Sequence, residues 1–481
     1  MVRGVVGGLE PSGVGWLQRV AYEVAVEGAG QAIGYYAELI ANEEAGDAPD
    51  LEAIAGWRKE QLAWAVRRRG LRPEDRVEIN AMYSEGEALL AEPEAGKTVS
   101  GELSEDENER IFRERIVPDE LTISHDSPGG NRSPVSDELT VSQESPGASG
   151  SPVADELTAS QESPGAGDSL MPDASPVPDE LPVPDGVGVG GGVAVDEVSV
   201  AGGGIGAGEA AAVDAETLAQ EGPVVVVVTG PPGDGKGAVG ALVEEVLVGR
   251  GRRPVRVAVD LYQPHWPVLR TSLASEPAED SYYTADGLRW TAKALAYARE
   301  HRYDVILETP LLEANDVVEF TAAGYRVEVA IVAVPEAVSR LGVLDRHLRE
   351  LEVYGYGRLA DPALHDAACQ RVLDVAEAVD RERIVDDVAV LRPDGELLDA
   401  PTSVKATVEE ERGRSWTAAE SRQFLDRLAE VQRIGMSAPI EWIQREAVEG
   451  ARAVRKLAAP HLHPDAVTMH IATAGVLPPD A

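Results

Sequence analysis

Apolar residues recur at intervals of three and four in three segments near the start of the chain. The segments are 16–44, 50–70 and 72–92. This spacing is typical of helices that bury one face against a partner. Asp50 and Pro73 suit the starts of the second and third helices. The pattern predicts a small helical domain over residues 14–95.

From residue 223 onwards, short apolar runs alternate with helical periodicity. The expected strands are 224–230, 255–260, 303–308 and 325–334, and the expected helices between and after them are 236–250, 286–301 and 335–352. Such alternation is typical of a parallel sheet with helices on both faces. We therefore expect an α/β domain over 223–400. Residues 401–481 are expected to form a C-terminal helical extension, which either packs on this domain or projects from it.

Between these regions, residues 96–222 are rich in Ser, Pro, Gly, Asp and Glu. The segment contains an 18-residue repeat that begins at 117, 135 and 153, with a shorter echo, VPDELPVPD, at 177. Each unit has too little apolar surface to form a core, so the composition predicts a disordered acidic linker. The alternative is that each repeat carries a short docking motif, repeated for avidity.

The charge balance excludes several classes of function. There are 84 acidic and 43 basic residues, which gives a formal net charge of −41. Such a chain repels nucleic acid and anionic lipid, so we expect neither as a partner. The longest apolar run, Val224 to Val228, is far too short to span a bilayer. With one cysteine, Cys369, and no apolar secretory leader at the start, a cytoplasmic location is expected.

The run GPPGDGK, over 230–236, lies between the first predicted strand and the helix that follows it. This strand, loop and helix order is the context of a phosphate-binding P-loop, whose backbone N–H groups converge on phosphate oxygens. The predicted fold is thus a P-loop NTPase-like parallel sheet with flanking helices. The residues expected to bind ATP are Gly230, Pro231, Pro232, Gly233, Asp234, Gly235, Lys236, Gly237 and Ala238.

Two carboxylates follow strands of the predicted sheet. Asp260 ends the second expected strand and Glu308 the third, so both should face the edge where open α/β folds bind ligands. A carboxylate there can take the proton of an attacking hydroxyl. Arg346 and Arg358 could neutralise the charge that phosphoryl transfer spreads over three oxygens, although arginines on helices are usually solvated.

Several motifs in order resemble the zeta toxin family of bacterial toxin-antitoxin systems. They are GPPGDGK, VAVD with LYQPHWP, YDVILET, GYRVEVAIVAVPEAVSRLGVLDR, GRLADPALHD and VLRPDGELL. The resemblance covers less than half of the chain. It implies an ATP-dependent kinase that phosphorylates the 3′-hydroxyl of UDP-N-acetylglucosamine, with ATP and Mg²⁺ required.

The resemblance also implies roles for individual residues. Asp260 would be the catalytic base and Lys236 the phosphate clamp, while Arg346 and Arg358 would contact phosphate. The acceptor would be bound by Asp260, Glu308, Thr309 and His265; no side chain is assigned to the metal. Two departures stand out. Gly237 replaces the family's Ser or Thr, a Mg²⁺ ligand, and Trp266 interrupts the family's His-Pro pair.

The family's antitoxin is a small three-helix protein that blocks the nucleotide site. The resemblance therefore suggests that residues 14–95 are an antitoxin-like inhibitor in cis, or that an antitoxin acts in trans. The alternative is that residues 14–95 are a generic helical interaction module. Two other functions stay open. The chain could be a P-loop kinase of another small hydroxyl substrate, or a catalytically silent ATP-binding or toxin-neutralising protein, to which Gly237 points.

Overall fold

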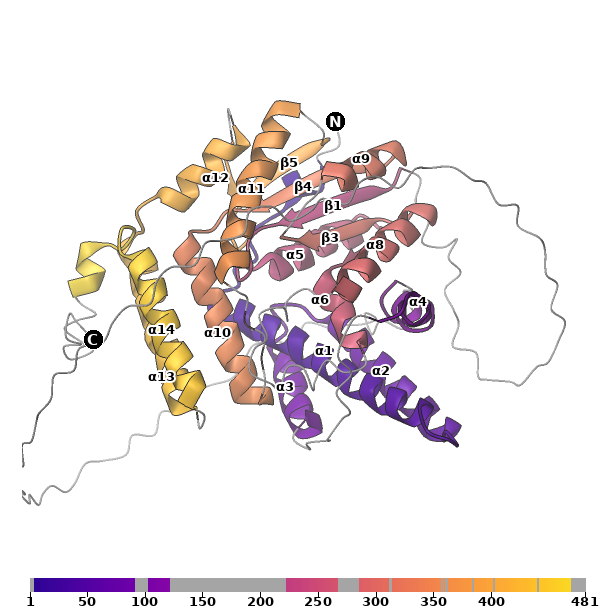
Figure 1. Ribbon diagram of the computed structural model, residues 1–481. Helices are drawn as coiled ribbons and strands as arrows, with labels where there is room; N and C mark the ends of the chain where they lie inside the picture. Colours follow the sequence, from indigo (N-terminus) through magenta and orange to yellow (C-terminus); the bar gives the residue numbers. More distant parts are fainter. Residues whose placement is uncertain are drawn as a thin grey trace, which may run out of the picture. The chain divides into compact units, whose positions relative to one another are not determined.

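The fold is seen in a computed structural model of the chain (Figure 1). It describes residues 4–90, 103–121, 222–266, 285–310, 314–355, 357, 359, 362–382, 385–400, 403–438 and 441–468. All of them belong to one compact unit, which spans 1–127 and 210–481. The repeats that begin at 135, 153 and 177, and the disorder expected for them, lie outside the described residues.

A six-stranded sheet forms the centre of this unit, in the order β2-β3-β1-β4-β5-β6. The strands are β1 (Val224–Thr229), β2 (Val255–Val257), β3 (Val305–Thr309), β4 (Arg326–Val332), β5 (Asp387–Leu391) and β6 (Leu397–Leu398). β1 is central and pairs in parallel with β3 and β4, whereas β6 pairs antiparallel with β5. The predicted α/β fold with a parallel sheet is therefore confirmed.

The valines of β1 are buried on both faces of the sheet, as expected for a strand that helices cover on both sides. Val225 and Val227 pack with α8 (Ala285–Glu300), α9 (Ala314–Ala322), α11 (Pro362–Glu382) and α12 (Val404–Gly413). Val224, Val226 and Val228 pack with α5 (Lys236–Gly249) and with the short 3-10 helix η1 (Val6–Gly8). In Figure 1 the strands β5, β4, β1 and β3 run side by side among these helices.

Residues 103–121 correct the predicted start of the linker at 96. They form α4 (Glu105–Ile111) and a π-helical segment, η2 (Phe112–Leu121), with Ser104 capping α4. Phe112, Ile116 and Leu121 are buried in the same cluster as β1 and α8. The polar composition of this stretch hides the few apolar side chains that attach it to the core.

The N-terminal segment forms the three predicted helices, α1 (Trp16–Glu44), α2 (Leu51–Gly70) and α3 (Arg76–Leu90). They share a small core that includes Ile33, Trp64 and Met82. They also pack on α10 (Glu336–Tyr354), where Tyr354 is buried with Val20, Val24 and Leu90. In Figure 1 these indigo and purple helices lie at one end of the sheet, next to α10.

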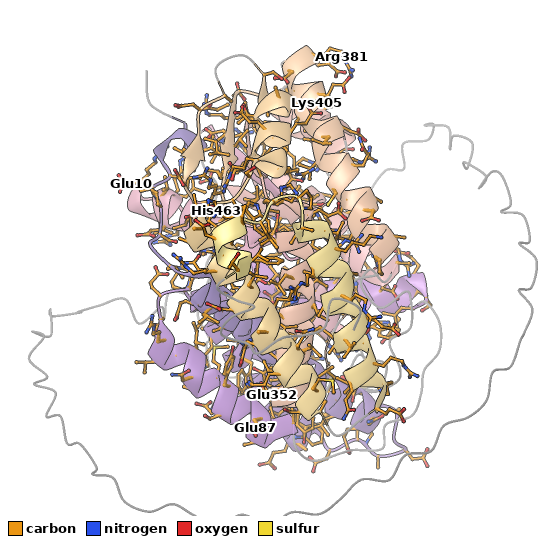
Figure 2. The ribbon with its side chains drawn as sticks, turned by 90° about the vertical axis from the view of Figure 1, so that its left-hand side faces the viewer. Glu10, Glu87, Glu352, Arg381, Lys405 and His463 are labelled. Carbon is orange, nitrogen blue, oxygen red and sulfur yellow. The ribbon has the colours of Figure 1, made fainter. Side chains whose placement is uncertain are left out.

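The C-terminal helices α13 (Ala418–Ser437) and α14 (Glu441–Ala458) pack on α10 rather than project from the fold. Leu344 and Leu348 of α10 are buried among them, and Arg427 of α13 forms a buried ion pair with Asp345. Figure 2 shows both helices facing the viewer, with His463 near one end of the pair. Within the described parts of the chain, every helix is too short or too polar to span a lipid bilayer.

Candidate functional site

The P-loop joins β1 to α5 through two glycines with positive φ, Gly233 at 76° and Gly235 at 86°. Only glycine adopts such angles without strain, so both positions need it. Helix α5 begins at Lys236, whose Nζ donates to the carbonyl of Pro231 and to Oδ1 of Asp234, at 3.2 Å each. The same Oδ1 accepts the backbone N–H of Lys236 at 2.9 Å, which fixes the turn into the helix.

Close backbone contact holds the P-loop against α10. A Cβ at Gly233 would overlap the carbonyl of Ser339, and one at Gly342 would overlap the carbonyl of Gly233. The two glycines therefore let the loop lie directly on the helix that carries Arg346. Burial raises the pKa of Asp234, and the charge of Lys236 opposes that rise. The loop thus contributes a cation that is paired with a buried carboxylate, whose ionised form is costly in that position.

A cavity of about 100 Å³ opens beside the P-loop. Its lining comes from the loop, α5, β2, α6, β3, α10 and α1. The lining residues are Tyr22, Glu23, Val26, Glu27, Gly233, Asp234, Lys236, Gly237, Arg256, Ala258, Val259, Asp260, Leu261, Glu308, Pro310 and Arg346. The cavity thus brings Lys236, Asp260, Glu308 and Arg346 together.

Glu308 makes an ion pair with a residue that the sequence did not single out. Arg256 of β2 donates through Nε to Oε1 of Glu308 at 2.8 Å and also through Nη2. Burial raises the pKa of Glu308, while the charge of Arg256 lowers it. A Cβ at Gly240 of α5 would meet this carboxylate, so the glycine makes room for the pair.

Asp260 lies three residues beyond the end of β2, in the short helix α6 (Val259–Tyr262), and so does not end the strand as expected. The strand is shorter because Ala258 already leaves the ladder and precedes the helix. Asp260 is half-buried and lines the cavity beside Glu308. Its predicted position at the ligand-binding edge of the sheet is therefore unchanged.

Other predicted site residues lie elsewhere. His265 is fully buried outside the cavity lining, with Nε2 at 3.4 Å from Oε1 of Glu120. Thr309 ends β3 and is half-buried, but does not line the cavity. Ala238 is buried in α5, and Arg358 lies outside the described residues.

Helix α1 forms one wall of the cavity. Tyr22 lines this wall, and its hydroxyl accepts a hydrogen bond from Nη1 of Arg256 at 3.2 Å. Glu23 also lines the cavity beside the P-loop. Burial raises the pKa of the Glu23 carboxyl, while the charges of Arg346 and Lys236 lower it. A carboxylate from the N-terminal helices thus lies among the cations of the phosphate site.

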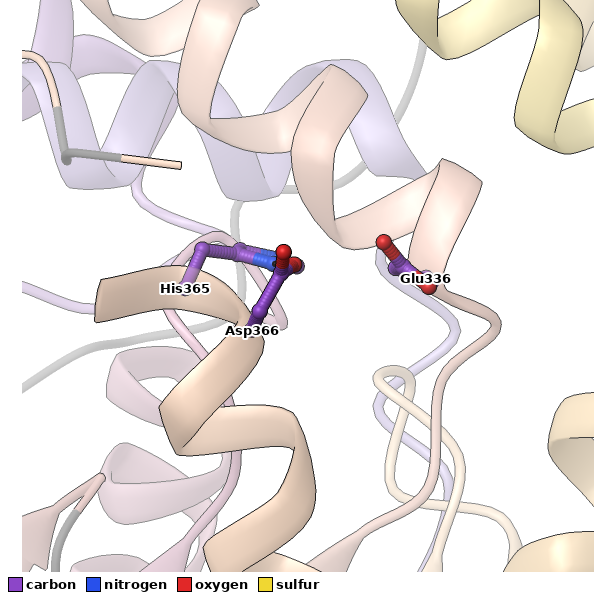
Figure 3. Close-up of side chains that lie close together, drawn as sticks. All are labelled: Glu336, His365 and Asp366. Carbon is purple, nitrogen blue, oxygen red and sulfur yellow. Dashed lines mark ion pairs between the residues drawn. The ribbon is translucent and has the colours of Figure 1, made fainter. Parts of the chain in front are cut away.

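A second group of metal-binding residue types lies outside this cavity. Glu336, His365 and Asp366 have ligand atoms within 4.8 Å of one another (Figure 3). Arg340 donates to both carboxylates, and Ser339 is hydrogen-bonded to Nε2 of His365 at 2.9 Å. Burial lowers the pKa of His365 to about 4, so the imidazole is neutral near pH 7. The guanidinium of Arg340 already neutralises part of the negative charge of this cluster.

A known protein family matches the part of the chain that contains the P-loop. Residues 209–403 match the family model described as zeta toxin. This segment is a zeta toxin domain. Its P-loop, parallel sheet and flanking helices are those of a P-loop kinase-like fold. No curated protein matches the chain.

Two solved structures show a distant likeness. One, from the PezAT chromosomal toxin-antitoxin system of Streptococcus pneumoniae, is 15% identical with a TM-score of 0.39 and covers 44% of this chain and 88% of its own. The other, AvrRxo1-ORF1:AvrRxo1-ORF2 with sulphate ions, is 12% identical with a TM-score of 0.30. It covers 55% of this chain and 85% of its own.

Sequence reasoning missed Glu23, Arg256 and Gly240 in and around the zeta toxin domain. Arg256 lies between two valines of β2. Alternation of apolar and polar residues predicts only that its side chain lies on the opposite face of the strand from the valines, not that it pairs with Glu308. Gly240 lies inside a predicted helix. A glycine there can indicate that another group packs closely against the helix, so the sequence did carry a signal for this position. Glu23 is one of several glutamates on α1, and only the tertiary contact distinguishes it.

Proposed function

We propose that the zeta toxin domain is an ATP-dependent kinase that phosphorylates a hydroxyl of a nucleotide sugar and acts as a toxin. The observation that carries the proposal is that Lys236, Asp260 and Arg346 line one cavity at the P-loop. The resemblance to zeta toxins favours the 3′-hydroxyl of UDP-N-acetylglucosamine as the acceptor.

In the proposed reaction, Asp260 accepts the proton of the acceptor hydroxyl as that oxygen bonds to the γ-phosphorus of ATP. The bond from the γ-phosphorus to the bridging oxygen of ADP breaks at the same time. Lys236 and Arg346 neutralise the charge on the transferring group and hold it in line. Glu308 stays paired with Arg256, and we infer that this pair supports the acceptor side of the cavity.

Mg²⁺ is expected to accompany ATP, and the donors in the cavity fit a hard cation. Asp260 presents a half-buried carboxylate, whereas Gly237 offers no hydroxyl after the P-loop lysine. One oxygen of Asp260 and water would therefore hold the ion, which leaves the other oxygen of Asp260 for the proton of the acceptor hydroxyl. When bound, Mg²⁺ supplies further neutralisation of phosphate charge.

We infer that the partner of this site is an antitoxin-like inhibitor in cis, formed by α1–α3. With α1 in place the cavity measures about 100 Å³, whereas sites for drug-sized ligands measure about 300–1,000 Å³. Glu23 puts a carboxylate near Lys236 and Arg346, where phosphate charge would bind. ATP and α1 thus compete for the phosphate-binding side of the cavity.

Gly28 offers a way to test this inhibitor. A Cβ at Gly28 would overlap the hydroxyl of Tyr354, so Gly28→Gln should push α1 away from α10. We expect the variant to bind ATP at least about tenfold more tightly than the wild type in calorimetry, because the competing helix is displaced. The matched control is Gly56→Gln, since a Cβ at Gly56 of α2 meets no atom within 4 Å. Equal ATP affinity in a folded Gly28→Gln variant would show that α1 does not cover the site.

The kinase itself is tested in the Gly28→Gln background. With ATP and UDP-N-acetylglucosamine, ³¹P NMR should show ADP and a new phosphate monoester. Asp260→Asn should slow product formation by about 10²–10⁴-fold, the usual contribution of a general base. Asp374→Asn, which changes an exposed carboxylate of α11, should leave the rate unchanged. Full activity in Asp260→Asn would refute the assignment of the base.

The alternatives give different results in the same assay. A kinase of another small hydroxyl substrate would form ADP only when that alcohol replaces the nucleotide sugar. A silent ATP-binding protein would bind ATP in the Gly28→Gln variant and form no product with any acceptor.

A further inference from the structure

The first copy of the repeated motif is docked on the fold. Residues 117–121 read Val-Pro-Asp-Glu-Leu and end η2. Leu121 is fully buried in the main core beside Tyr262. Glu120 is also buried, and its Oε1 accepts from Nη2 of Arg68 at 2.5 Å and lies 3.4 Å from Nε2 of His265. The motif therefore occupies a built site with an apolar pocket and two basic side chains.

The same motif, Val-x-Asp-Glu-Leu, recurs three times further along the chain. The copies are 135–139, 153–157 and 177–181, and x is Ser, Ala and Pro in turn. In the docked copy, Asp119, Glu120 and Leu121 are buried and Val117 is half-buried, whereas Pro118 is exposed. The four positions that the copies share are thus the ones that contact the fold, and the position that varies faces solvent.

We propose that the surface formed by Arg68, Tyr262 and His265 is a docking site for the Val-x-Asp-Glu-Leu motif. The copies at 135–139, 153–157 and 177–181 can each replace residues 117–121 on it. Every copy supplies the carboxylate for Arg68 and the leucine for the pocket.

Docking at this site ties the N-terminal helices to the zeta toxin domain. Arg68 belongs to α2, and the Nη2 that binds Glu120 also donates to the carbonyl of Leu261 at 3.0 Å, next to Asp260. A docked glutamate therefore balances a cation that is itself buried between the two parts, since Arg68 is 2% exposed. An empty site would leave that charge without its carboxylate, which is costly in a buried position.

The first copy has an advantage over the others. Phe112 and Ile116, just before it, are buried in the same core, whereas Gly-, Ser- and Pro-rich residues precede the later copies. The later copies are tethered to the same chain, and short tethers give effective concentrations of about millimolar. They are therefore expected to dock when the first copy is displaced.

Hydrogen exchange on full-length variants tests the proposal. Glu120→Gln with Leu121→Ala disables the first copy, and the same changes in all four copies disable the motif. We expect exchange at Arg67–Leu71 and Tyr262–Trp266 to be about tenfold slower in the first variant than in the second, because later copies still dock. Amides of a later copy should gain protection in the first variant. Glu144→Gln with Glu162→Gln, which changes repeat glutamates outside the motif, is the control.

A milder series guards against loss of folding, because Leu121→Ala alters the core. It replaces only the motif glutamate with Gln, in the first copy or in all four, and circular dichroism checks the fold of each. The same order of exchange rates is expected. Identical exchange in the one-copy and four-copy variants, with no protection gained at 135–139, 153–157 or 177–181, would overturn the proposal.

Discussion

At the scale of single residues, two glycines of α5 near Glu308 differ in how much space they leave for a side chain. Gly240 has no room for a Cβ because the carboxylate of Glu308 lies against it. Gly237, one turn earlier, is different. Its added Cβ would lie 3.7 Å from Oε2 of Glu308 and 3.8 Å from Cε1 of Tyr22, which is ordinary contact. The first glycine is required by packing, whereas the second is not.

Gly237→Ser should therefore fold normally and add a hydroxyl where a Mg²⁺ ligand is expected. In the Gly28→Gln background, we expect ATP affinity to rise about three- to tenfold with Mg²⁺ present and to stay unchanged without it. Calorimetry with and without the metal measures this. Gly249→Ser, at an open position of the same helix, is the control. A gain that does not depend on Mg²⁺ would mean that the hydroxyl acts on the fold instead.

Some residues of the site could be predicted from the sequence, whereas their ion-pair partners could not. Lys236, Asp260 and Glu308 could be expected near one another because the P-loop and the strand ends of a parallel sheet share one edge, whereas Arg346 was added by the resemblance to zeta toxins. Their counter-charges could not, because pairing depends on tertiary approach. Lys236, for example, forms an ion pair with Asp234, only two residues before it in the sequence. His265, expected near the acceptor, is instead buried against Glu120.

At the scale of elements, η2 shows why a segment that packs on the core can be predicted from its sequence to be a linker. Ile111, Ile116 and Leu121 are buried and lie five residues apart. A search for intervals of three and four does not detect this five-residue spacing, and among the buried apolar residues of 111–121 only Phe112 and Ile116 are four apart. Strand β1 and helices α5 and α10, with regular periods and long apolar runs, were predictable within two residues at each end.

The docked motif should make stability depend on pH. Burial raises the pKa of Asp119 to about 6, above its ordinary value of 3.8. The folded protein therefore binds this proton more tightly than the unfolded chain, so its free energy of unfolding falls as pH rises from about 4 to about 6. The loss is at most about 3 kcal/mol, from 1.36 kcal/mol per unit.

Asp119→Asn removes this dependence. Urea unfolding of the full chain between pH 4 and 7 should show the variant gaining stability relative to the wild type up to about pH 6. Above that, the difference should be constant. A difference that does not change with pH would mean that Asp119 keeps an ordinary pKa in the folded protein.

At the scale of the whole molecule, Arg427 links three parts of the chain. It lies on α13, pairs with Asp345 of α10, and its guanidinium carbon lies 4.6 Å from the ring centre of Trp16, at the start of α1. Asp345 is fully buried. Helices from both ends of the sequence thus meet on the helix that supports the P-loop.

Arg427→Ala should lower the free energy of unfolding by about 1–3 kcal/mol, because the buried Asp345 loses one of its two arginine partners and keeps Arg349 at 2.8 Å. It should also weaken the contact of α1 with α10 and increase ATP binding. Thermal unfolding and calorimetry measure the two effects. Arg433→Ala, an exposed arginine of the same helix paired with Glu430, should change stability by no more than about 0.5 kcal/mol. Similar losses in both variants would contradict a special role for Arg427.

The position of α1 before β1 in the chain has a consequence for synthesis. A ribosome completes residues 16–44 before it makes the P-loop that they contact, and chains fold from the N-terminus as they emerge. A cover on a separate chain would have to find each new enzyme by diffusion, and its occupancy would vary with its concentration. Under the proposed inhibition by α1, each P-loop is synthesised together with one inhibitor, in a ratio that the expression level does not change.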